Sequence, residues 1–477
     1  MTDPVVVIGG DAAGLSAASK LSREDPDREV IVFERGEWVS YAHCGIPYYV
    51  KGEVDSLTDM LSLSPPEIEG RGIDLRREHE VLAVDADAER VRVRGPDGEF
   101  DQPYGEVLVA TGARPVSDPI PGSDLDGAFT VHGLDSAASL RAALTPPEAF
   151  SVDALGGGEF VDREAAERYG AMTPPETAAI VGGGYVGVEM AEALAAHDLD
   201  VHLFQRPETL LPPFGEAVGS EVAGTLREQG VTLHLGTEVE RLVGSDGRVS
   251  GLRCGDGTEL SVGLAVVGIG VRPNVEVVRD TPVALGDSGA IAVDEYGETS
   301  VDGVYAAGDC AEARHVVTGE PTWVPLGLTA NRAGRAIGRT LAGDPTPVGG
   351  VAGTAVVKAS DLECGRTGLT DLDEAREAGF DPVAETITAG SRSGYYPGAA
   401  DTTVRLVADR GSGRLLGGSI VGTDRAAVRI DTVATALEGG LAVDEMERLD
   451  LAYAPPFSPV WDPVLVAAKV LNGSLGE

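Results

Sequence analysis

Lysine is almost absent from this sequence. Only four of its 37 basic residues are lysines, while 77 acidic residues give a formal net charge of −40. A surface that acidic repels a phosphate backbone, which excludes nucleic acid as a partner. Because 43% of the residues are hydrophobic, the chain can fold, and its acidic residues do not form a disordered acidic tail. Dispersed acid with so little lysine is typical of proteins that work in concentrated salt, and it predicts a halophilic, haloarchaeal source.

Cysteine is also scarce, and long apolar runs are missing. The four cysteines are Cys44, Cys254, Cys310 and Cys364. None forms a C-x-x-C pair, so the sequence predicts neither a disulfide framework nor a metal site. No apolar run approaches the roughly 20 residues that span a bilayer, and the N-terminal stretch, with Asp3 and Asp11, lacks the pattern of a signal peptide. We therefore expect a cytoplasmic protein with no membrane partner.

A strand, a glycine-rich turn and a helix open the chain. Residues 4–9 form an apolar run, the turn is Gly9-Gly10-Asp11-Ala12-Ala13-Gly14, and a second apolar run, Val30–Phe33, ends in Glu34. This βαβ pattern, with an acid about twenty residues after the last glycine, is typical of a dinucleotide site in which the acid bonds a ribose hydroxyl. Asp11 stands where the middle glycine belongs, so its carboxylate has to point away from a pyrophosphate.

The same pattern recurs in the middle of the chain. The strand Ala178–Val181 leads into Gly182-Gly183-Gly184-Tyr185-Val186-Gly187, and a second strand, Val201–Phe204, ends in Gln205-Arg206. No acid stands at the ribose-binding position, whereas Arg206 is suited to pair with a 2′-phosphate. The sequence therefore predicts a second dinucleotide site that prefers NADPH, although a merely solvated Arg206 leaves NADH possible. The residues predicted for this site are Gly182, Gly184, Tyr185, Gly187, Gln205 and Arg206, and the family resemblance given below adds Gly268 and Gly270.

A third element distinguishes the first dinucleotide from the second. Val304–Cys310 is a strand that leads into a turn, where Asp309 is placed to bond a ribitol chain. Together with Ala110-Thr111-Gly112, this element resembles the FAD-binding signature of the two-dinucleotide-binding flavoprotein disulfide reductases. The residues that the resemblance assigns to FAD are Gly9, Gly10, Gly14, Glu34, Arg35, Val81, Ala110, Thr111, Gly112, Asp309 and Ala330. Within the element we expect Cys310 to be a small buried residue with no redox role.

Cys44 is the candidate redox centre. It lies in the segment Ser40-Tyr41-Ala42-His43-Cys44-Gly45-Ile46-Pro47-Tyr48-Tyr49. Pro47 predicts the start of a helix, and a helix N-terminus stabilises a thiolate, which would lower the pKa of Cys44. The segment resembles the motif of the single-cysteine branch of that family, the coenzyme A disulfide reductases. Tyr49 stands where the two-cysteine relatives have their second cysteine, so the resemblance implies a single protein sulfur at the redox centre.

The resemblance extends over nearly the whole chain. In coenzyme A disulfide reductases, motifs like Gly394–Gly398 and Leu451–Pro459 bring tyrosines of the partner subunit to the cysteine. By that likeness Tyr395 and Tyr453 are expected to reach across a homodimer to the redox cysteine. Tyr396 competes with Tyr395 for this role.

Three features depart from the family pattern. His43 stands where asparagine is usual. Residues 145–177 form an additional segment rich in proline, glycine and acid, which we expect to be a mobile surface insert because prolines disfavour helix. In the sister NADH oxidases and peroxidases a histidine of the first fingerprint serves a cysteine sulfenic acid, whereas this chain has Ala12 at that position. Peroxide chemistry would therefore lack its acid–base partner.

The substrate site is expected to collect basic residues, because coenzyme A carries phosphates. Ser16, Lys20 and Arg23 follow one another at spacings of four and three, on one face of the helix after the first fingerprint. In the resembled reductases this helix borders the substrate channel. The alternative is a solvated cationic face at the end of the helix. The residues predicted to bind substrate are Ser16, Lys20, Arg23, Ser40, His43 and Asn331.

These patterns predict an α/β protein with three domains. Residues 1–116 and 274–347 are expected to form a discontinuous FAD-binding domain of Rossmann type. Residues 117–273, with the insert at 145–177, are expected to form a second Rossmann-like domain for NAD(P)H. Residues 348–477 carry no nucleotide motif and are expected to form an α+β dimerisation domain.

The predicted function is reduction of a low-molecular-weight disulfide, such as coenzyme A disulfide, by NAD(P)H. Electrons are expected to pass through the flavin to Cys44, which forms a mixed disulfide with the substrate, and Tyr395 or Tyr453 is expected to protonate or orient the leaving thiolate. One alternative is an NAD(P)H oxidase or peroxidase that uses a Cys44 sulfenic acid. Another is a flavin redox sensor or partner-binding protein that uses the insert to recruit its partner.

The acidic composition predicts that the protein needs salt. Its melting temperature and activity are expected to rise as KCl is added to dilute buffer, because counter-ions screen the repulsion between carboxylates. Thermal unfolding and activity across a KCl series measure this dependence, with an uncharged solute of equal osmolarity as the control. Full stability and activity in dilute buffer would contradict a halophilic origin.

Overall fold

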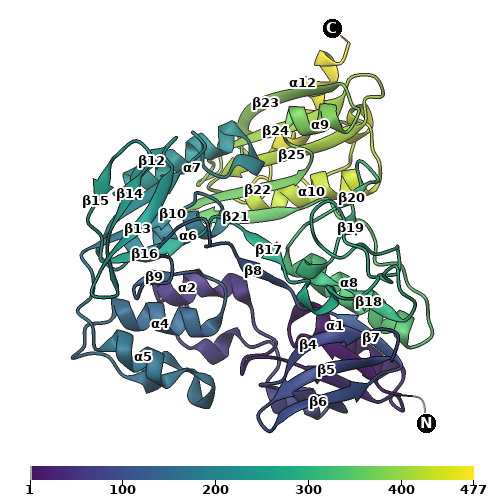
Figure 1. The fold of residues 1–477 in the computed structure, drawn as a ribbon. Helices are drawn as coiled ribbons and strands as arrows, with labels where there is room; N and C mark the ends of the chain where they lie inside the picture. Colours follow the sequence, from purple (N-terminus) through teal and green to yellow (C-terminus); the bar gives the residue numbers. More distant parts are fainter. Residues whose placement is uncertain (1–2, 477) are drawn as a thin grey trace.

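Short runs of valine and isoleucine form the first parallel sheet (Figure 1). The computed structural model describes residues 3–476 and pairs β1 (Val5–Ile8) in parallel with β2 (Val30–Phe33) and β7 (Glu106–Val109). The strands β3 (Ile73–Arg76) and β18 (Val304–Ala306) complete the order β18-β7-β1-β2-β3. Both β1 and β2 are buried along their whole length, as expected for a parallel sheet that is covered on both faces.

Neighbouring residues of β1 face two different layers. Val7 packs with helices α1 (Ala12–Glu24) and α8 (Gly327–Leu341), which lie against each other. Ile8 packs on the opposite face with the antiparallel sheet β4-β5-β6. The strands of that sheet are β4 (Glu80–Asp85), β5 (Arg90–Gly95) and β6 (Gly98–Pro103). Because β18 and α8 belong to these layers, the first domain is assembled from two separate parts of the chain.

The second fingerprint lies in a sheet of the same kind. Strand β10 (Thr177–Val181) is followed by α6 (Tyr185–Ala195) and β11 (Asp200–Gln205), and the all-parallel order is β12-β11-β10-β16-β9. The other elements of this domain are β9 (Ala128–Phe129), α4 (Leu134–Leu144), α5 (Arg163–Gly170), α7 (Glu216–Glu228), β12 (Thr232–Leu235), β13 (Val239–Ser245), β14 (Arg248–Cys254), β15 (Glu259–Leu260) and β16 (Leu264–Val267). The prediction of two Rossmann-like units is therefore confirmed.

The chain passes between the two sheets through a pair of short strands. β8 (Ala113–Pro115) and β17 (Val271–Pro273) pair antiparallel, next to the domain boundaries expected near residues 116 and 273. The remaining short elements of the first domain are α2 (Ile46–Lys51), α3 (Pro65–Glu69), β19 (Ala313–Arg314) and β20 (Pro321–Thr322).

The last part of the chain is an antiparallel sheet with helices, at the yellow-green end of Figure 1. Its order is β21-β22-β25-β24-β23, and α10 (Ala426–Glu438) and α12 (Pro463–Ser474) pack against it. The other bounds are β21 (Ala355–Ala359), β22 (Leu362–Gly368), α9 (Leu372–Glu377), β23 (Pro382–Gly390), β24 (Asp401–Asp409), β25 (Leu415–Gly422) and α11 (Val443–Met446). The expected α+β domain is confirmed.

The insert at residues 145–177 is packed, so the prediction of a mobile surface segment is wrong. The insert contains α5 and two 3₁₀ turns, Val152–Leu155 and Gly158–Phe160. Several of its apolar side chains lie in the largest core cluster of the protein. They are Val152, Leu155, Val161, Ala166 and Tyr169. The prolines lie at 146–147 and 174–175, at the two ends of the insert, and leave its centre free to form helix.

The insert packs against the segment that carries Cys44. The buried Tyr49 hydroxyl of α2 donates a hydrogen bond to the Leu155 carbonyl at 3.1 Å, and the Gly156 carbonyl accepts from the Ser56 hydroxyl at 2.7 Å. Phe160 packs edge-on against Trp38, with ring centroids 5.5 Å apart. The insert is therefore part of the support of α2.

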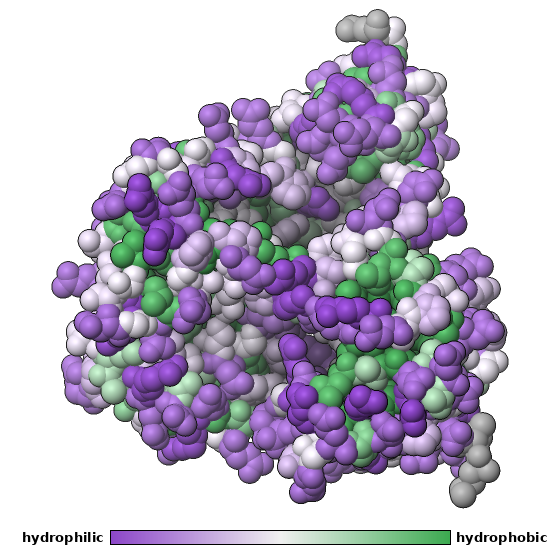
Figure 2. Space-filling view, viewed as in Figure 1, coloured by the Kyte–Doolittle hydropathy of each residue, from purple (hydrophilic) through white to green (hydrophobic). Residues whose placement is uncertain are grey.

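The outer surface is largely polar. Hydrophilic side chains cover much of the face seen in Figure 2, with smaller hydrophobic areas between them. Over residues 3–476, no helix has the length and apolar character needed to cross a membrane.

Leu155→Ala is expected to lower the melting temperature markedly. The side chain is only 4% exposed within the core cluster, and truncating a buried leucine costs about 2–5 kcal/mol of the free energy of unfolding. Thermal unfolding followed by circular dichroism measures the shift, with Leu285→Ala, where the side chain is 48% exposed, as the matched control. A mobile insert would give equal melting temperatures for the two variants.

Candidate active site

One large cavity joins the two glycine-rich turns. It has a volume of about 2260 Å³, and its wall includes Cys44, Gly10 of the first turn and Gly184 of the second. All residues predicted to bind cofactor or substrate line this cavity, with four exceptions. The exceptions are Gly14, Lys20, Val81 and Gly187. The structure thus brings nearly all the predicted site residues together from both domains.

The first turn is shaped by a very close approach of helix to strand. A Cβ atom on Gly14 would lie 2.0 Å from the Gly9 carbonyl oxygen, so only glycine fits there. The Glu34 carboxylate accepts the Gly10 and Gly36 backbone N–H groups, each at 2.9 Å. Burial raises the pKa of Glu34. Gly14 therefore acts through packing, which explains why it does not line the cavity.

The second turn repeats this geometry with an amide in place of the acid. A Cβ on Gly187 would lie 1.8 Å from the Gly182 carbonyl oxygen, and the buried Gln205 side chain accepts the Gly183 N–H at 2.9 Å. A Cβ on Gly184 would meet no protein atom within 4 Å, so open space lies beside this turn. Gln205 is engaged by the protein, and Arg206 is the exposed group at the strand end.

These features fit two dinucleotides. Both turns leave backbone N–H groups beside open cavity, where a pyrophosphate binds in this type of fold. Asp309 lines the same cavity as the first turn and Cys44, and burial raises its pKa to about 6. Val81 lies instead in the core between β4 and the first sheet, so its side chain faces away from the cavity.

Asp11 faces the Cys44 segment and not the open side of the turn. Its carboxylate accepts the Tyr41 backbone N–H at 3.2 Å and pairs with the His43 imidazole. Ser40, with φ of 53°, holds this segment against the turn by donating its N–H to the Gly10 carbonyl at 3.0 Å. Asp11 and His43, which both depart from the usual pattern of the resembled family, are thus in contact with each other.

Cys44 lies in a 3₁₀ turn, His43–Gly45, just before α2. Pro47 occupies the first turn of α2, as predicted. The expected lowering of the thiol pKa is wrong, because the surrounding protein and the nearby Glu189 carboxyl raise the pKa of Cys44. The helix is only six residues long and does not outweigh these effects.

Glu189 of α6 is a site residue that the motifs missed. It lines the cavity, and the Tyr48 hydroxyl donates a hydrogen bond to its carboxyl at 3.0 Å. Burial raises the pKa of Glu189 to about 7, so the carboxyl holds a proton for much of the time at neutral pH. The sequence signal that could have identified Glu189 is an acid within the largely apolar helix after the second fingerprint.

The predicted cationic face is only partly directed at the cavity. Ser16 donates a hydrogen bond to Asn331 at 2.6 Å and Arg23 lines the cavity, but Lys20 pairs with Glu24 outside it. Arginines that the sequence did not single out also line the cavity, Arg366 of β22 and two others. The two others are Arg71, which donates to Ser19 at 3.2 Å, and Arg335 of α8. Lys20 adds no positive charge to the cavity wall, because it pairs with Glu24 one turn later on the same helix.

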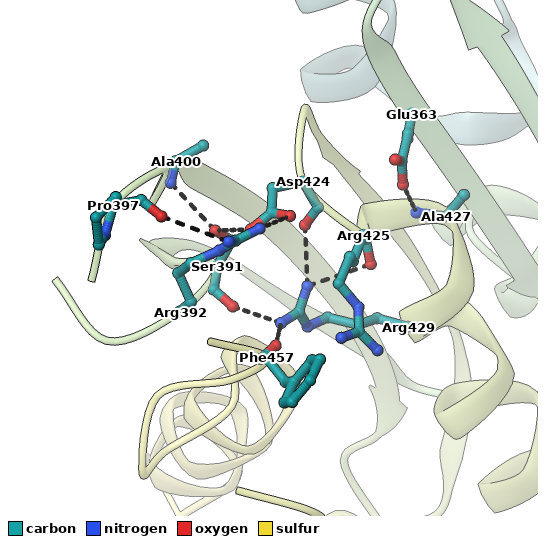
Figure 3. A network of polar contacts seen from close by, with 10 residues as sticks. All are labelled: Glu363, Ser391, Arg392, Pro397, Ala400, Asp424, Arg425, Ala427, Arg429 and Phe457. Carbon is teal, nitrogen blue, oxygen red and sulfur yellow. Dashed lines mark hydrogen bonds and ion pairs between the residues drawn. The ribbon is translucent and has the colours of Figure 1, made fainter. Parts of the chain in front are cut away.

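The tyrosine segments lie on the C-terminal domain, away from the cavity of the same chain. Tyr395 is 78% exposed and Tyr453 is 49% exposed. Figure 3 shows a polar network of this domain, in which the Arg429 guanidinium donates to the carbonyls of Ser391, at 2.5 Å, and Phe457, at 3.3 Å. One buried arginine therefore holds both tyrosine-bearing segments together.

Further ion pairs fix the same network. Asp424 accepts from the Ser391 hydroxyl at 2.6 Å and pairs with Arg392, while Asp462 accepts from Arg429 at 2.9 Å. The segments before Tyr395 and after Tyr453 are thus tied to each other by charged hydrogen bonds.

The other cysteines are buried. Cys310 is fully buried, and its thiol lies 3.3 Å from the carbonyls of Val109 and Ala307, in agreement with a packing role. Cys254 and Cys364 also lie in the interior. Within residues 3–476, Cys44 is therefore the one thiol on the cavity wall.

Comparison with known families gives a match over almost the whole chain. The family model described as pyridine nucleotide-disulphide oxidoreductase matches residues 3–332, and the model of the dimerisation domain of that family matches residues 354–463.

Individual relatives match over nearly their full length. The NAD(P)H coenzyme A polysulfide/persulfide reductase of Pyrococcus horikoshii is 40% identical over 474 residues, covering 99% of each chain. An NADH oxidase of Methanocaldococcus jannaschii is 32% identical over 97% of each chain, and a coenzyme A disulfide reductase of Staphylococcus haemolyticus is 28% identical over 95% of this chain and 96% of its own. The solved structure of an NAD-dependent persulfide reductase from A. fulgidus superposes with a TM-score of 0.89 at 33% identity, covering 99% of this chain and 83% of that one.

Proposed function

Because this chain belongs to the pyridine nucleotide-disulphide oxidoreductase family, we propose that it uses NAD(P)H and FAD to reduce a low-molecular-weight disulfide at Cys44. One observation carries the proposal. Cys44 is the one thiol that lines the cavity between the two dinucleotide-type turns. The relatives named as coenzyme A disulfide and persulfide reductases support the same chemistry.

The residues present suit both cofactors. The turn at Gly9–Gly14, with Asp309 and Ala110–Gly112, would hold FAD, and the turn at Gly182–Gly187, with Arg206, would hold the nicotinamide dinucleotide. Bound at these residues, FAD would supply the redox chemistry that links a hydride from NAD(P)H to an electron pair for sulfur.

The sulfur chemistry needs one protein thiol. The Cys44 thiolate attacks one sulfur of the substrate disulfide, forming a mixed disulfide and releasing the first thiolate, which takes up a proton. Two electrons and one proton then cleave the mixed disulfide, restore the Cys44 thiolate and release the second thiol. Glu189 is suited to hold a proton near this sulfur, because its pKa lies close to neutrality.

The substrate is proposed to carry phosphate, as coenzyme A disulfide does. Arg23, Arg71 and Arg335 face the cavity from three different segments of a chain that is otherwise strongly acidic. Such a concentration of arginine suits phosphate recognition. A coenzyme A persulfide would satisfy the same residues.

A homodimer is proposed to complete the site. The match to the dimerisation domain supports it, and the exposure of Tyr395 and Tyr453 leaves both hydroxyls free to contact a second subunit. In the dimer these tyrosines would orient or protonate the thiolate that leaves Cys44.

An NAD(P)H oxidase is the second candidate, favoured by the relative of that name from Methanocaldococcus jannaschii. The chain has Ala12 where the resembled oxidases and peroxidases carry a histidine, which leaves a sulfenic acid at Cys44 without that partner. NAD(P)H consumption with coenzyme A disulfide under anaerobic conditions, compared with oxygen uptake in air, separates the two functions.

Cys44→Ser is expected to lower NAD(P)H-dependent coenzyme A disulfide reduction by about a thousandfold or more, because a serine hydroxyl is not ionised at neutral pH and cannot form the mixed disulfide. Release of thiol under anaerobic conditions is the measurement. Electron transfer to ferricyanide is the control, because it needs both cofactors but no thiol. Full disulfide reductase activity in this variant would refute the proposal.

Arg206→Gln tests the proposed preference for NADPH. The change is expected to lower kcat/KM for NADPH by about tenfold, because the pairing between guanidinium and 2′-phosphate is lost, and to leave NADH almost unaffected. Steady-state kinetics with both cofactors measures the effect. Arg241→Gln, a change at another exposed arginine of the same domain, is the matched control. Equal losses with the two cofactors would show that Arg206 does not select between them.

A further inference from the structure

Two unusual residues of the site contact each other. Asp11 replaces a glycine of the first turn, and His43 precedes the redox cysteine, 32 positions later in the chain. The Asp11 carboxylate pairs with Nε2 of His43 and also accepts the Tyr41 N–H. The His43 ring stacks on the Tyr41 ring, with centroids 4.2 Å apart. The cysteine segment is thereby fastened to the cofactor turn.

The hydrogen bonds of His43 define its protonation state. Nδ1 lies 2.7 Å from the carbonyl oxygen of His132, and Nε2 faces the Asp11 carboxylate. A carbonyl and an ionised carboxylate only accept, so both ring nitrogens must donate, which requires imidazolium. Burial by itself lowers the pKa of His43, but the hydrogen bond and charge of Asp11 outweigh it and raise the pKa.

The surroundings of the pair are mostly acidic. Asp309 faces His43 from the turn after β18, and the same carboxyl, together with Glu189, disfavours a thiolate at Cys44. His132, from the loop before α4, stays neutral because burial lowers its pKa to about 4. Arg35, after β2, is a cation that acts on Tyr41 and His132. An unpaired Asp11 would leave a negative charge on the cofactor turn, against His43, the residue that directly precedes Cys44.

We propose that Asp11 and His43 act as one unit, in which His43 is the built-in counter-ion that lets an acid occupy the first turn and keeps its charge from suppressing the Cys44 thiolate. His43 is a positioning residue. This inference rests on the proposed function only in taking Cys44 as the reacting thiol. It predicts that loss of His43 alone slows the reactions of Cys44 and that loss of Asp11 together with His43 restores them.

Alkylation of Cys44 tests the pair directly, because iodoacetamide reacts with the thiolate. His43→Asn leaves Asp11 uncompensated and is expected to slow alkylation at pH 7.5 by roughly threefold or more. Asp11→Asn/His43→Asn removes both charges and is expected to return the rate to within about twofold of the original protein. Mass spectrometry of the Cys44 peptide measures the rates. A double variant as slow as His43→Asn, or a His43→Asn rate equal to that of the original protein, overturns the proposal.

A matched control exists on β11, where Asp200 and His202 form another Asp–His pair at 3.3 Å. Asp200→Asn/His202→Asn is expected to leave the alkylation rate unchanged, and a comparable loss there would mean that the effect is not specific to the pair at Cys44.

Thermal unfolding gives a second measurement that does not depend on the thiol. Because the folded protein raises the pKa of His43, the pair contributes stability below the ordinary histidine pKa and loses that contribution as the pH rises through the raised value. The melting temperature of the original protein is expected to fall more steeply between pH 6 and 9 than that of the Asp11→Asn/His43→Asn variant. Parallel curves would contradict the ion pair. Both readouts remain valid if Cys44→Ser proves fully active, so failure of the proposed function is distinguishable from failure of this inference.

Discussion

Contact between the carbonyl of Gly9 and the backbone of Gly14 is the constraint on which the rest of the site depends. No side chain fits between them, so β1 and α1 meet at one fixed distance. The neighbouring segments take their positions from this turn. Ala110 donates its N–H to Ile8, and Ser40 donates to Gly10. The segment with Cys44 is therefore positioned from the same backbone that shapes the first glycine-rich turn, which suits the proposed chemistry between cofactor and sulfur.

The second domain uses the same backbone geometry with a different charge. Glu34 and Gln205 occupy equivalent places and each accepts an N–H from its own turn at 2.9 Å. The geometry of the turn needs an acceptor, and either an acid or an amide supplies it. What differs is the local charge: the acid Glu34 precedes Arg35 at the first strand end, whereas the neutral Gln205 precedes Arg206 at the second. The second strand end is therefore the more positive of the two.

The sequence predicted the features that depend on neighbours along the chain. The βαβ units, the glycine spacing, the helix start at Pro47 and the burial of Cys310 all follow from local patterns. It failed where distant segments meet. The raised pKa of Cys44 comes in part from Glu189, 145 positions away, and the partner of Asp11 lies 32 positions away. Lys20 is different, because its neutralising partner Glu24 was visible one turn along the same helix.

The prediction of a mobile insert was wrong for the same reason. Its proline-rich ends suggested a loop, while its burial depends on a hydrophobic surface supplied by the Cys44 segment and by α4. Composition describes what a segment contains and not what covers it.

That packing has a consequence for how the halves of the chain are combined. The insert belongs to the domain of the second glycine-rich turn, yet its Leu155 carbonyl accepts a hydrogen bond from the Tyr49 hydroxyl, on the helix that follows Cys44 in the domain of the first turn. The two halves are therefore not interchangeable modules. A chimera that takes residues 117–273 from a relative without this insert would alter the second glycine-rich turn. It would also remove contacts that support the helix after Cys44.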